Sequence, residues 1–395
     1  MNRLKLTTGG ESHGPGLTAL LQGMPAGMKV DFDVLRQQMA LRMHGYGRGN
    51  RMKIEGDTVE VRGGLRGGET LGSPIVLWIE NRDFKNWQPM MDPVEVDPRR
   101  AEQRRVHLPR PGHADLSGGL KYQRRDLRDV LERASARETA ARVAAGSFAR
   151  MFLSHFGVEI ASGVRSLGAL GAEAPPPSWQ DLQGVDHASP LRAIDSSLEH
   201  RMVELVDEAK ERGDTLGGAV SVVAHNVPAG LGSHVQWDEK LDGRLARAVM
   251  SVPAVKAVEI GAALTASRDF GSLAHDAIGL DSQGRWERPT NRAGGTEGGI
   301  TNGEDIVVTA YKKPIATLVQ GMPSVDLDTL EAQTSKYERS DVTALPAAGI
   351  IAEAMVALVL ADALLEKLGG DSMTEILDHW QASRTLLESW PAWAR

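Results

Sequence analysis

Residues 110–146, RPGHADLSGGLKYQRRDLRDVLERASARETAARVAAG, join a glycine-broken loop that carries His113 to a long segment with a helical pattern. Between Arg99 and Arg142 there are twelve Lys and Arg against six Asp and Glu. Residues 36–53 add five Lys and Arg and no acid. Arginines, a histidine and the backbone N–H groups of a glycine loop are typical donors to bound anions. The stretch therefore predicts an anion site where the loop meets the helix.

These basic segments form a positive island in an acidic protein, since the 395 residues carry a formal net charge of −7. An island favours the focusing of a small anion, because nucleic-acid binders usually show a basic excess across the whole domain. The chain has no cysteine, which excludes disulfides and thiolate chemistry. Its eleven histidines show no HxxxH or HExxH spacing, so no metal site is expected.

The apolar spacing predicts two long helices. Residues 126–155 carry an apolar stripe that ends before Gly157, and residues 347–368 form a strongly apolar helix closed by two glycines. Shorter helices are predicted over 33–41 and 198–211, and strands over 57–62, 74–79, 216–224 and 305–311. Because strands and helices come in blocks, the pattern favours an α+β fold over a regular βαβ alternation.

The organisation of the chain favours one domain over residues 1–395, with a surface loop or insertion at 172–184, where three prolines follow one another. The tryptophan-rich tail at 372–395 is either a packed terminal helix or a contact with a partner. No apolar run approaches the roughly 20 residues that span a bilayer, and the first residues lack the core of a signal peptide. A cytoplasmic protein with no membrane partner is expected.

The arginines of the long predicted helix differ in their neighbours. Asp129 precedes Arg133 by one turn and Glu138 precedes Arg142 in the same way, so ordinary ion pairing explains these two arginines as well as function does. Arg137 has no acid at either neighbouring turn. We therefore expect Arg137 to face an anion or a distant carboxylate.

Other side chains are candidates for chemistry. Ser135 lies between the arginines as a possible hydroxyl donor to a ligand, although a serine within a helix usually points to solvent or bonds a backbone carbonyl. His13 lies in GGESHGPG and His113 in RPGHAD, where Asp115 and Arg110 are close in sequence. Histidines in glycine-bounded loops beside charged groups are candidates for general acids.

The segment after the last predicted strand offers donors to a phosphate. The glycine-rich loop 294–303 precedes strand 305–311, which then leads to residues 313–317 with a lysine and a threonine. Backbone N–H groups, a lysine and a hydroxyl at one end of a sheet suit a cofactor phosphate. Arg339 and Asp341 precede the last long helix, where a local ion pair and a functional role are equally plausible.

Several long motifs in this order resemble the chorismate synthase family from Gly10 to about Asp371. They are GESHGPG, GYGRGNRMKIE, RPGHADLSGGLKY, RDLRDVLERASARETAARVAAG, SVPAVKAVEIG, GGTEGGITNG, KKPIAT and ERSDVTALPAAGIIAEAMVALVLADALLEKLGGD. The resemblance implies a sandwich with a helical core between antiparallel sheets, and a homotetramer. It implies a lyase that converts 5-enolpyruvylshikimate 3-phosphate to chorismate by 1,4-elimination of phosphate, with reduced FMN and no net redox change.

Matched motif by motif, the resemblance also implies roles for single residues. The flavin would contact Arg133, Ala134, Ser135, Pro253, Ala254, Gly298, Lys313, Pro314, Ile315, Ala316, Thr317 and Arg339. The substrate would meet Arg42, Arg48, Arg51, Arg110, Ser135 and Arg137. His13 would protonate the departing phosphate, His113 would protonate the flavin, and Asp341 would assist proton removal through the flavin.

Two other classes of protein remain open from the residues alone. A basic-groove protein that binds nucleic acid or polyphosphate would show affinity that falls steeply with salt, and the acidic remainder of the chain argues against it. A flavin oxidoreductase with net electron transfer would need a nicotinamide site, and no GxGxxG fingerprint supplies one. The cations around Arg42 and Arg48 could still hold the phosphate of NADP instead of the substrate.

Overall fold

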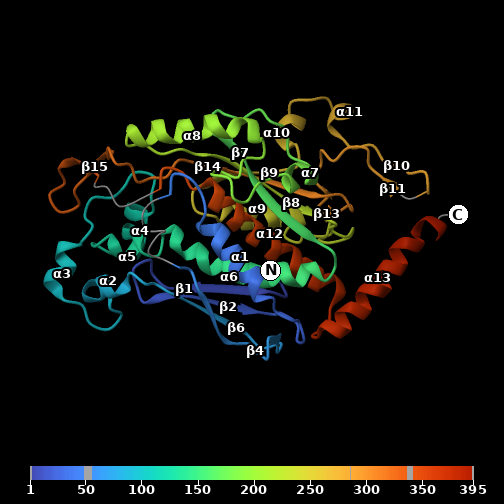
Figure 1. Ribbon diagram of the computed structural model, residues 1–395, viewed down its shortest axis with the longest axis horizontal. Coiled ribbons are helices and arrows are strands. Elements are labelled where there is room, and N and C mark those ends of the chain that lie inside the picture. The colour runs from blue at the N-terminus through green and yellow to red at the C-terminus, as the bar shows by residue number, and fades with distance from the viewer. Residues whose placement is uncertain (1, 49–55, 285, 336–340, 394–395) are drawn as a thin grey trace.

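Two antiparallel sheets of four strands enclose a set of helices (Figure 1). The computed structural model describes residues 2–48, 56–284, 286–335 and 341–393. In the first sheet the strand order is β1-β2-β6-β3, from β1 (Lys5–Gly9), β2 (Gly16–Gln22), β6 (Ile75–Glu80) and β3 (Val59–Gly63). In the second sheet the order is β7-β8-β14-β9, from β7 (Glu159–Leu167), β8 (Gly218–His225), β14 (Ile306–Lys312) and β9 (Val255–Ile260).

The helices between the sheets form the core. α6 (Thr139–Ser154) lies on the first sheet, α12 (Leu345–Leu368) lies on the second, and the two helices pack against each other. α1 (Phe32–Met43) contacts both of them, and α9 (Leu241–Met250) contacts α12 and β9. The prediction of an α+β sandwich with a helical core between antiparallel sheets is therefore confirmed.

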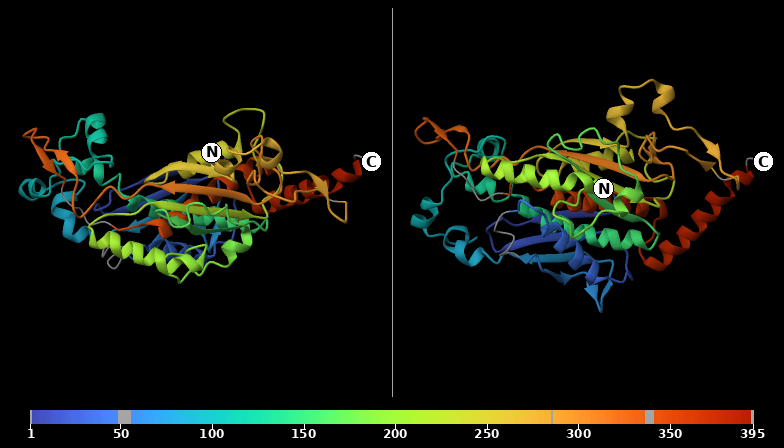
Figure 2. Two further views of the ribbon diagram at one scale, coloured as in Figure 1. Left: turned by 90° about the horizontal axis from the view of Figure 1, so that it is seen from above. Right: turned by 45° about the horizontal axis from the view of Figure 1, so that its top comes forward.

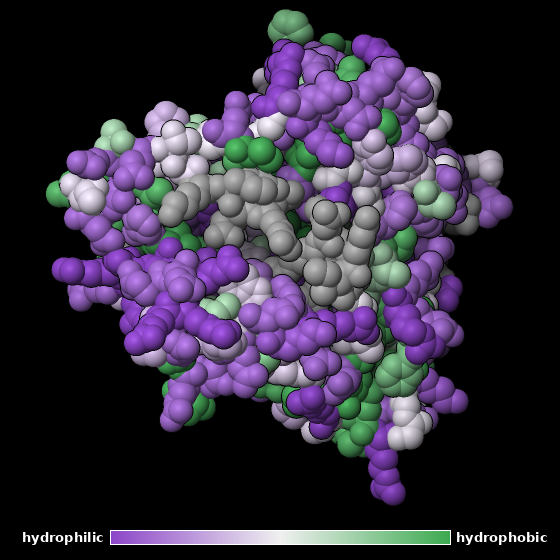
Figure 3. Space-filling model, turned by 60° about the vertical axis from the view of Figure 1, so that its left-hand side comes forward, coloured by the Kyte–Doolittle hydropathy of each residue, from purple (hydrophilic) through white to green (hydrophobic). Residues whose placement is uncertain are grey.

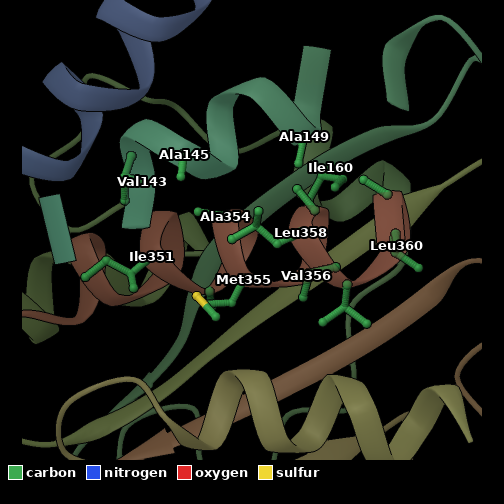
Figure 4. Close-up of a cluster of buried hydrophobic side chains, with 14 of the residues drawn as sticks. Val143, Ala145, Ala149, Ile160, Ile351, Ala354, Met355, Val356, Leu358 and Leu360 are labelled. Carbon is green, nitrogen blue, oxygen red and sulfur yellow. The ribbon is translucent and has the colours of Figure 1, made fainter. Parts of the chain in front are cut away.

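Small residues let α6 and α12 approach closely. Side chains of α6, including Ala145 and Ala149, point toward Ala354 and Leu358 of α12 (Figure 4). At Gly146 a Cβ atom would lie only 2.4 Å from the Cβ of Ala354. The absence of a side chain at this position therefore sets the distance between the two core helices.

α12 corrects one expectation from the sequence. With 24 residues it is long and apolar enough to cross a membrane, whereas the sequence was expected to contain no apolar run of that length. Its apolar window is completely buried between the sheets, as in the core helix of a globular protein. Asp362 of this helix accepts hydrogen bonds from the backbone N–H groups of residues 2–4, so α12 also fixes the start of the chain.

The helix predicted over 126–155 is wrong as a single element. The chain forms α5 (Arg128–Leu131), leaves the helical conformation, makes a 3-10 turn (Ala136–Glu138) and only then enters α6. Ser135 is extended, with φ −66° and ψ 143°, and its Oγ accepts a hydrogen bond from the N–H of Arg137. This local capping bond is the alternative to helix that serine offers the backbone.

The other predicted elements have counterparts within a few residues, including α8 (Ser196–Glu211). Residues 172–184 are not all loop, because α7 (Trp179–Gln183) begins there with a capping box at Ser178 and buries Trp179. The tail forms α13 (Met373–Trp393), which buries Met373 and then extends away from the body (Figure 2).

Shorter elements complete the fold. They are β4 (Leu65–Arg66), β5 (Glu69–Thr70), α2 (Phe84–Met91), α3 (Pro98–Gln103), α4 (Asp115–Tyr122), α10 (Ala263–Ala266), α11 (Gly271–Ala274), β10 (Gly279–Leu280), β11 (Trp286–Glu287), β12 (Thr296–Glu297), β13 (Ile300–Thr301), β15 (Pro323–Val325) and β16 (Ala332–Thr334). The hairpin β15–β16 and helices α2 to α5 lie at one end, and α13 projects at the other (Figure 2).

Candidate functional site

A cavity of about 630 Å³ opens where β14 ends and where α6 and α12 begin. The end of the molecule that carries α2 to α5 is covered mainly by hydrophilic side chains (Figure 3). The cavity brings together sixteen residues predicted from the sequence: His13, Arg42, Arg48, Arg110, His113, Arg133, Ala134, Ser135, Arg137, Pro253, Ala254, Lys313, Ile315, Ala316, Thr317 and Asp341.

His13 is held at the wall of the cavity by a buried carboxylate. It lies in the turn between β1 and β2, and its Nδ1 is 2.9 Å from Oε2 of Glu132, which also accepts the backbone N–H of His13. Burial alone would raise the pKa of Glu132, but its hydrogen bond with His13 and the nearby charge of Arg128 lower this pKa. The ring of His13 also lies 4.1 Å from the ring of Trp87. The carboxylate thus fixes a tautomer with Nδ1–H, which leaves Nε2 as the free ring nitrogen.

His113 forms a second pair of the same kind. Its Nδ1 lies 2.6 Å from Oδ1 of Asp115, and Arg110 donates to the same carboxylate from Nε and Nη2. Burial would raise the pKa of Asp115, yet the bonds from His113 and Arg110 hold this pKa well below its usual range. An ionised Asp115 has no proton to give, so Nδ1 of His113 is the donor. Arg110 also donates to Oγ1 of Thr317 at 3.0 Å, which joins this pair to the segment after β14.

Arg42 and Arg137 share one buried carboxylate. Nη1 of Arg42 donates to Asp57 Oδ2 at 2.7 Å, and Nη1 of Arg137 donates to Oδ1 of the same side chain. Arg42 also bonds Thr139 and the carbonyl of Ala136, and its burial lowers the pKa of its guanidinium to about 10 despite Asp57. The expectation that Arg137 faces an anion or a distant carboxylate agrees with this contact, since Asp57 is far away in sequence.

Asp57→Asn is expected to lower the free energy of unfolding by about 2 kcal/mol, because two buried arginines lose their common negative charge. Asparagine tolerates the positive φ of 40° found at this residue, so the backbone is preserved. Inorganic phosphate should then raise the melting temperature of the variant more than that of the unaltered protein. Thermal unfolding with and without phosphate tests this. Glu60→Gln, in an exposed pair with Arg62, is the control and should change little.

The broken helix also changes the partners of the neighbouring arginines. The expected pair of Asp129 with Arg133 does not form, because the helix ends between them and Asp129 accepts from Arg124 instead. Arg133 donates to the carbonyls of residues 8 and 10 and to the Thr8 hydroxyl. The expected pair of Glu138 with Arg142 is present at 2.8 Å. Ser135 lies on an extended link at the cavity, not within a helix.

The segment after β14 forms an apolar wall with one lysine. Pro253, Ala254 and Ile315 line this side, and the N–H of Lys313 donates to the carbonyl of Ala254. Ala254 has φ +68°, a conformation that residues with a side chain rarely adopt. Strained backbone of this kind persists where the surrounding structure enforces it, often at ligand sites. Nζ of Lys313 donates to the carbonyl of Gly112 at 2.8 Å.

Two predicted contacts, Gly298 and Pro314, do not line this cavity, and two others lie outside the described residues. Gly298 turns the β12–β13 hairpin, before the start of β14, whereas the cavity lies beyond the other end of that strand. Pro314 does not line the cavity, although both of its neighbours in sequence do. Arg51 and Arg339 lie outside the described residues. The contact of Gly298 with the flavin therefore stays a prediction, and the geometry of the single chain does not support it.

Two groups were missed in the sequence: Lys312, which lines the cavity, and Glu132, which holds His13 at its wall. Glu132 was counted only as a charge, and nothing in a single sequence links it to a loop more than a hundred residues earlier. Lys312 directly precedes the predicted Lys313, and it lies on the same face of β14 as Val308 and Ala310. The alternation of that strand was a signal that could have found it. Arg48, which was predicted, pairs with Asp341 at 3.2 Å.

A family model of chorismate synthase matches residues 4–365. The chain belongs to the chorismate synthase family. Chorismate synthase of Symbiobacterium thermophilum is 51% identical over 385 residues, which cover 96% of this chain and 98% of that protein. That of Aquifex aeolicus is 50% identical over 381 residues, which cover 94% and 95%. A crystal structure of chorismate synthase matches with a TM-score of 0.77 at 41% identity and covers 98% of both chains.

Chorismate synthase is a carbon–oxygen lyase of the shikimate pathway, which leads to the aromatic amino acids. Membership in this family places the chain among enzymes rather than among nucleic-acid-binding proteins or oxidoreductases with net electron transfer. The cavity is lined by several arginines and by His13 and His113, each of which contacts a buried carboxylate.

Proposed function

We propose that this chorismate synthase eliminates phosphate from 5-enolpyruvylshikimate 3-phosphate in the cavity between β14, α6 and α12, with reduced FMN as cofactor. The observation that carries the proposal is that His13 and His113, each oriented by a buried carboxylate, face the same cavity as Arg48, Arg110 and several further cations. The proposed substrate carries a phosphate and two carboxylates. Cations near a leaving phosphate stabilise the charge that develops on it.

The residues of the cavity fit a flavin. A volume of about 630 Å³ lies in the range of cofactor sites. The wall of Pro253, Ala254 and Ile315 suits an aromatic ring system, and Arg133, Ser135 and residues 313–317 offer donors to its polar groups and phosphate. When bound, reduced FMN would supply electron density that helps the bond between carbon and phosphate oxygen to break.

Different side chains of the cavity would carry out the proton transfers and the binding of the substrate. We assign to His13 the proton that the departing phosphate takes up, because Glu132 holds Nδ1 and leaves Nε2 free. His113, held in the same way by Asp115, would keep a proton at the cofactor. Asp341 is a carboxylate of the cavity that can take up the ring proton lost in the elimination. Arg110 and Arg137, which are themselves bonded to Asp115 and Asp57, would add positive charge at the cavity wall that attracts the anionic groups of the substrate.

The remaining expectations belong to the same proposal. Arg42 is occupied by Asp57, Thr139 and Ala136, so it supports the cavity rather than supplying a complete guanidinium to NADP or to the substrate. The anion that we propose to bind near Arg48 is a group of the substrate rather than the phosphate of NADP. The homotetramer and the cytoplasmic location are proposed from family membership.

An anaerobic assay tests the reaction. The protein is mixed with 5-enolpyruvylshikimate 3-phosphate and chemically reduced FMN, and chorismate is followed by its absorbance. We expect product to form over many turnovers while the flavin spectrum stays reduced, because the elimination has no net redox change. A stoichiometric oxidation of the flavin would instead support a redox enzyme. No product, with flavin binding confirmed by titration, would exclude the proposed reaction.

A further inference from the structure

Lys312 is a cation of the cavity to which neither the family motifs nor the proposed mechanism gives a role. It is the last residue of β14; its pairing with Gly218 of β8 is in regular register, and its pairing with Val255 of β9 follows a register shift after Tyr311. Val308 and Ala310, two and four residues earlier, point into the main core and are buried. By the alternation of a strand, Lys312 points to this same inner side, where the core gives way to the cavity.

The side chain of Lys312 has no hydrogen-bond or ion-pair partner among the described residues, in contrast to Lys313, whose Nζ is bonded to Gly112. Three charged groups act on it electrostatically: Asp341 before α12, Arg48 after α1 and Lys313 at its own strand end. Asp341 is paired with Arg48 at 3.2 Å. In the described part of this cavity side, one carboxylate thus faces two cations, and Lys313 adds a third at its edge.

The start of α12 adds a further positive field. The N-cap residue Ala344 and Ala347 of the first turn line the cavity, and no side chain of the described residues caps this end of the helix. The N-terminal end of a long helix carries a partial positive charge and N–H groups that favour an anion. Among the residues that the structure describes, Lys312, Arg48 and this helix end place more positive than negative charge beside Asp341.

We propose that Lys312 is a further substrate-binding residue, whose ammonium contacts one anionic group of the substrate at the α12 end of the cavity. This inference rests on the proposed function. Its chemistry is general, because an ammonium with unused donors at a partly dry site binds a phosphate or a carboxylate alike. The experiment must therefore tell these groups apart.

The pKa of Lys312 in the free protein agrees with an anion-binding site. Burial, with smaller contributions from Lys313 and Arg48, lowers the pKa of Lys312 to about 8, although Asp341 opposes the shift. An unfolded lysine titrates higher, so the unfolded chain binds more protons between these values and the charged lysine destabilises the free protein at pH 7. Ligand sites often carry such a cost to stability.

Equilibrium binding is measured by calorimetry for the unaltered protein and for Lys312→Met, in the presence of oxidised FMN. Lys256→Met, which removes an exposed lysine of β9 outside the cavity, is the matched control. We expect Lys312→Met to weaken binding of 5-enolpyruvylshikimate 3-phosphate about ten- to a hundredfold and the control to bind as before. Lys312→Met should also melt at a higher temperature than the unaltered protein at pH 7, which excludes misfolding as the cause of weaker binding.

Two further ligands identify the anionic group. Shikimate 3-phosphate lacks the enolpyruvyl carboxylate, and chorismate lacks the phosphate. Weaker binding of shikimate 3-phosphate alone indicates the phosphate, weaker binding of chorismate alone indicates the enolpyruvyl carboxylate, and weaker binding of both indicates the ring carboxylate. If Lys312→Met binds all three ligands as tightly as the control does, the inference is wrong. If the unaltered protein binds none of them, the proposed function is what fails.

The pH dependence provides an independent check. The phosphate of the substrate is already a dianion above about pH 7, so a change of affinity at higher pH reports the protein. We expect the affinity of the unaltered protein to fall as the pH rises past about 8, whereas Lys312→Arg keeps its affinity because a guanidinium stays charged. Equal pH profiles for the two proteins would contradict the assignment.

Discussion

Replacement of His113 by alanine is expected to lower turnover by about two to four orders of magnitude while flavin affinity changes little, and His13→Ala should behave in the same way. Each imidazole is oriented by a buried carboxylate, at 2.6 Å from Asp115 and 2.9 Å from Glu132, and faces the cavity. Such groups act on protons during the reaction and contribute less to holding the ligands. Single-turnover kinetics with reduced FMN, beside a flavin titration, measures both quantities.

The chain offers a matched control for these variants. His200 on α8 also lies near a carboxylate, Glu204 at 3.4 Å, but both side chains are exposed. His200→Ala should leave turnover unchanged. If His13→Ala and His113→Ala both keep near-normal turnover, the two histidines are not the acids of the reaction. Glu132→Gln separates orientation from chemistry, because it keeps the shape of the carboxylate and removes the charge that selects the tautomer of His13.

Gly146→Ala is expected to lower the free energy of unfolding by about 3 kcal/mol. The added Cβ would lie 2.4 Å from the Cβ, 2.7 Å from the Cα and 2.9 Å from the carbonyl oxygen of Ala354. Two of these atoms belong to the backbone of α12, so a whole helix has to move. The α6–α12 contact lies between both sheets, and the strain therefore spreads through the core. Chemical denaturation measures the loss.

Alanine at Gly243 is the matched control, and we expect it to cause no loss of stability. Gly243 lies in α9, and a Cβ there would meet no atom within 4 Å. Alanine has the higher helix propensity, so Gly243→Ala should be neutral or raise stability by up to about 1 kcal/mol. A similar loss for both variants would show that the close approach of α6 to α12 is not what Gly146 provides.

The fold could be predicted from the sequence where a local pattern is compatible with only one kind of element. The apolar run of α12 and the alternating strands β6 and β14 appear near their expected positions, and the block arrangement indicated the α+β class. The break before α6 was not predictable from apolar spacing. Apolar residues of the stripe lie on both sides of this break, but Ser135 caps the chain in an extended conformation there. An apolar stripe shows which residues are apolar, but it does not show where the backbone leaves the helical conformation.

The site was predictable only as far as its members lie in motifs. His13, His113 and Lys313 were found because the segments around them have a recognisable composition. Asp57 and Glu132 were not found as partners, because each acts across the fold on residues far away in sequence. Pairing of this kind is decided by how the first sheet and α6 come together, which no local pattern encodes.

The position of α12 after all strands of the two four-stranded sheets has a consequence for synthesis. Every strand of both sheets leaves the ribosome before this helix does, yet the second sheet packs its inner face on α12, and Asp362 binds the backbone of residues 2–4. Until translation has passed about residue 368, apolar faces of the nascent chain lack their partner, and such faces are what chaperones bind. The core therefore closes only after the residues of α12 have been made.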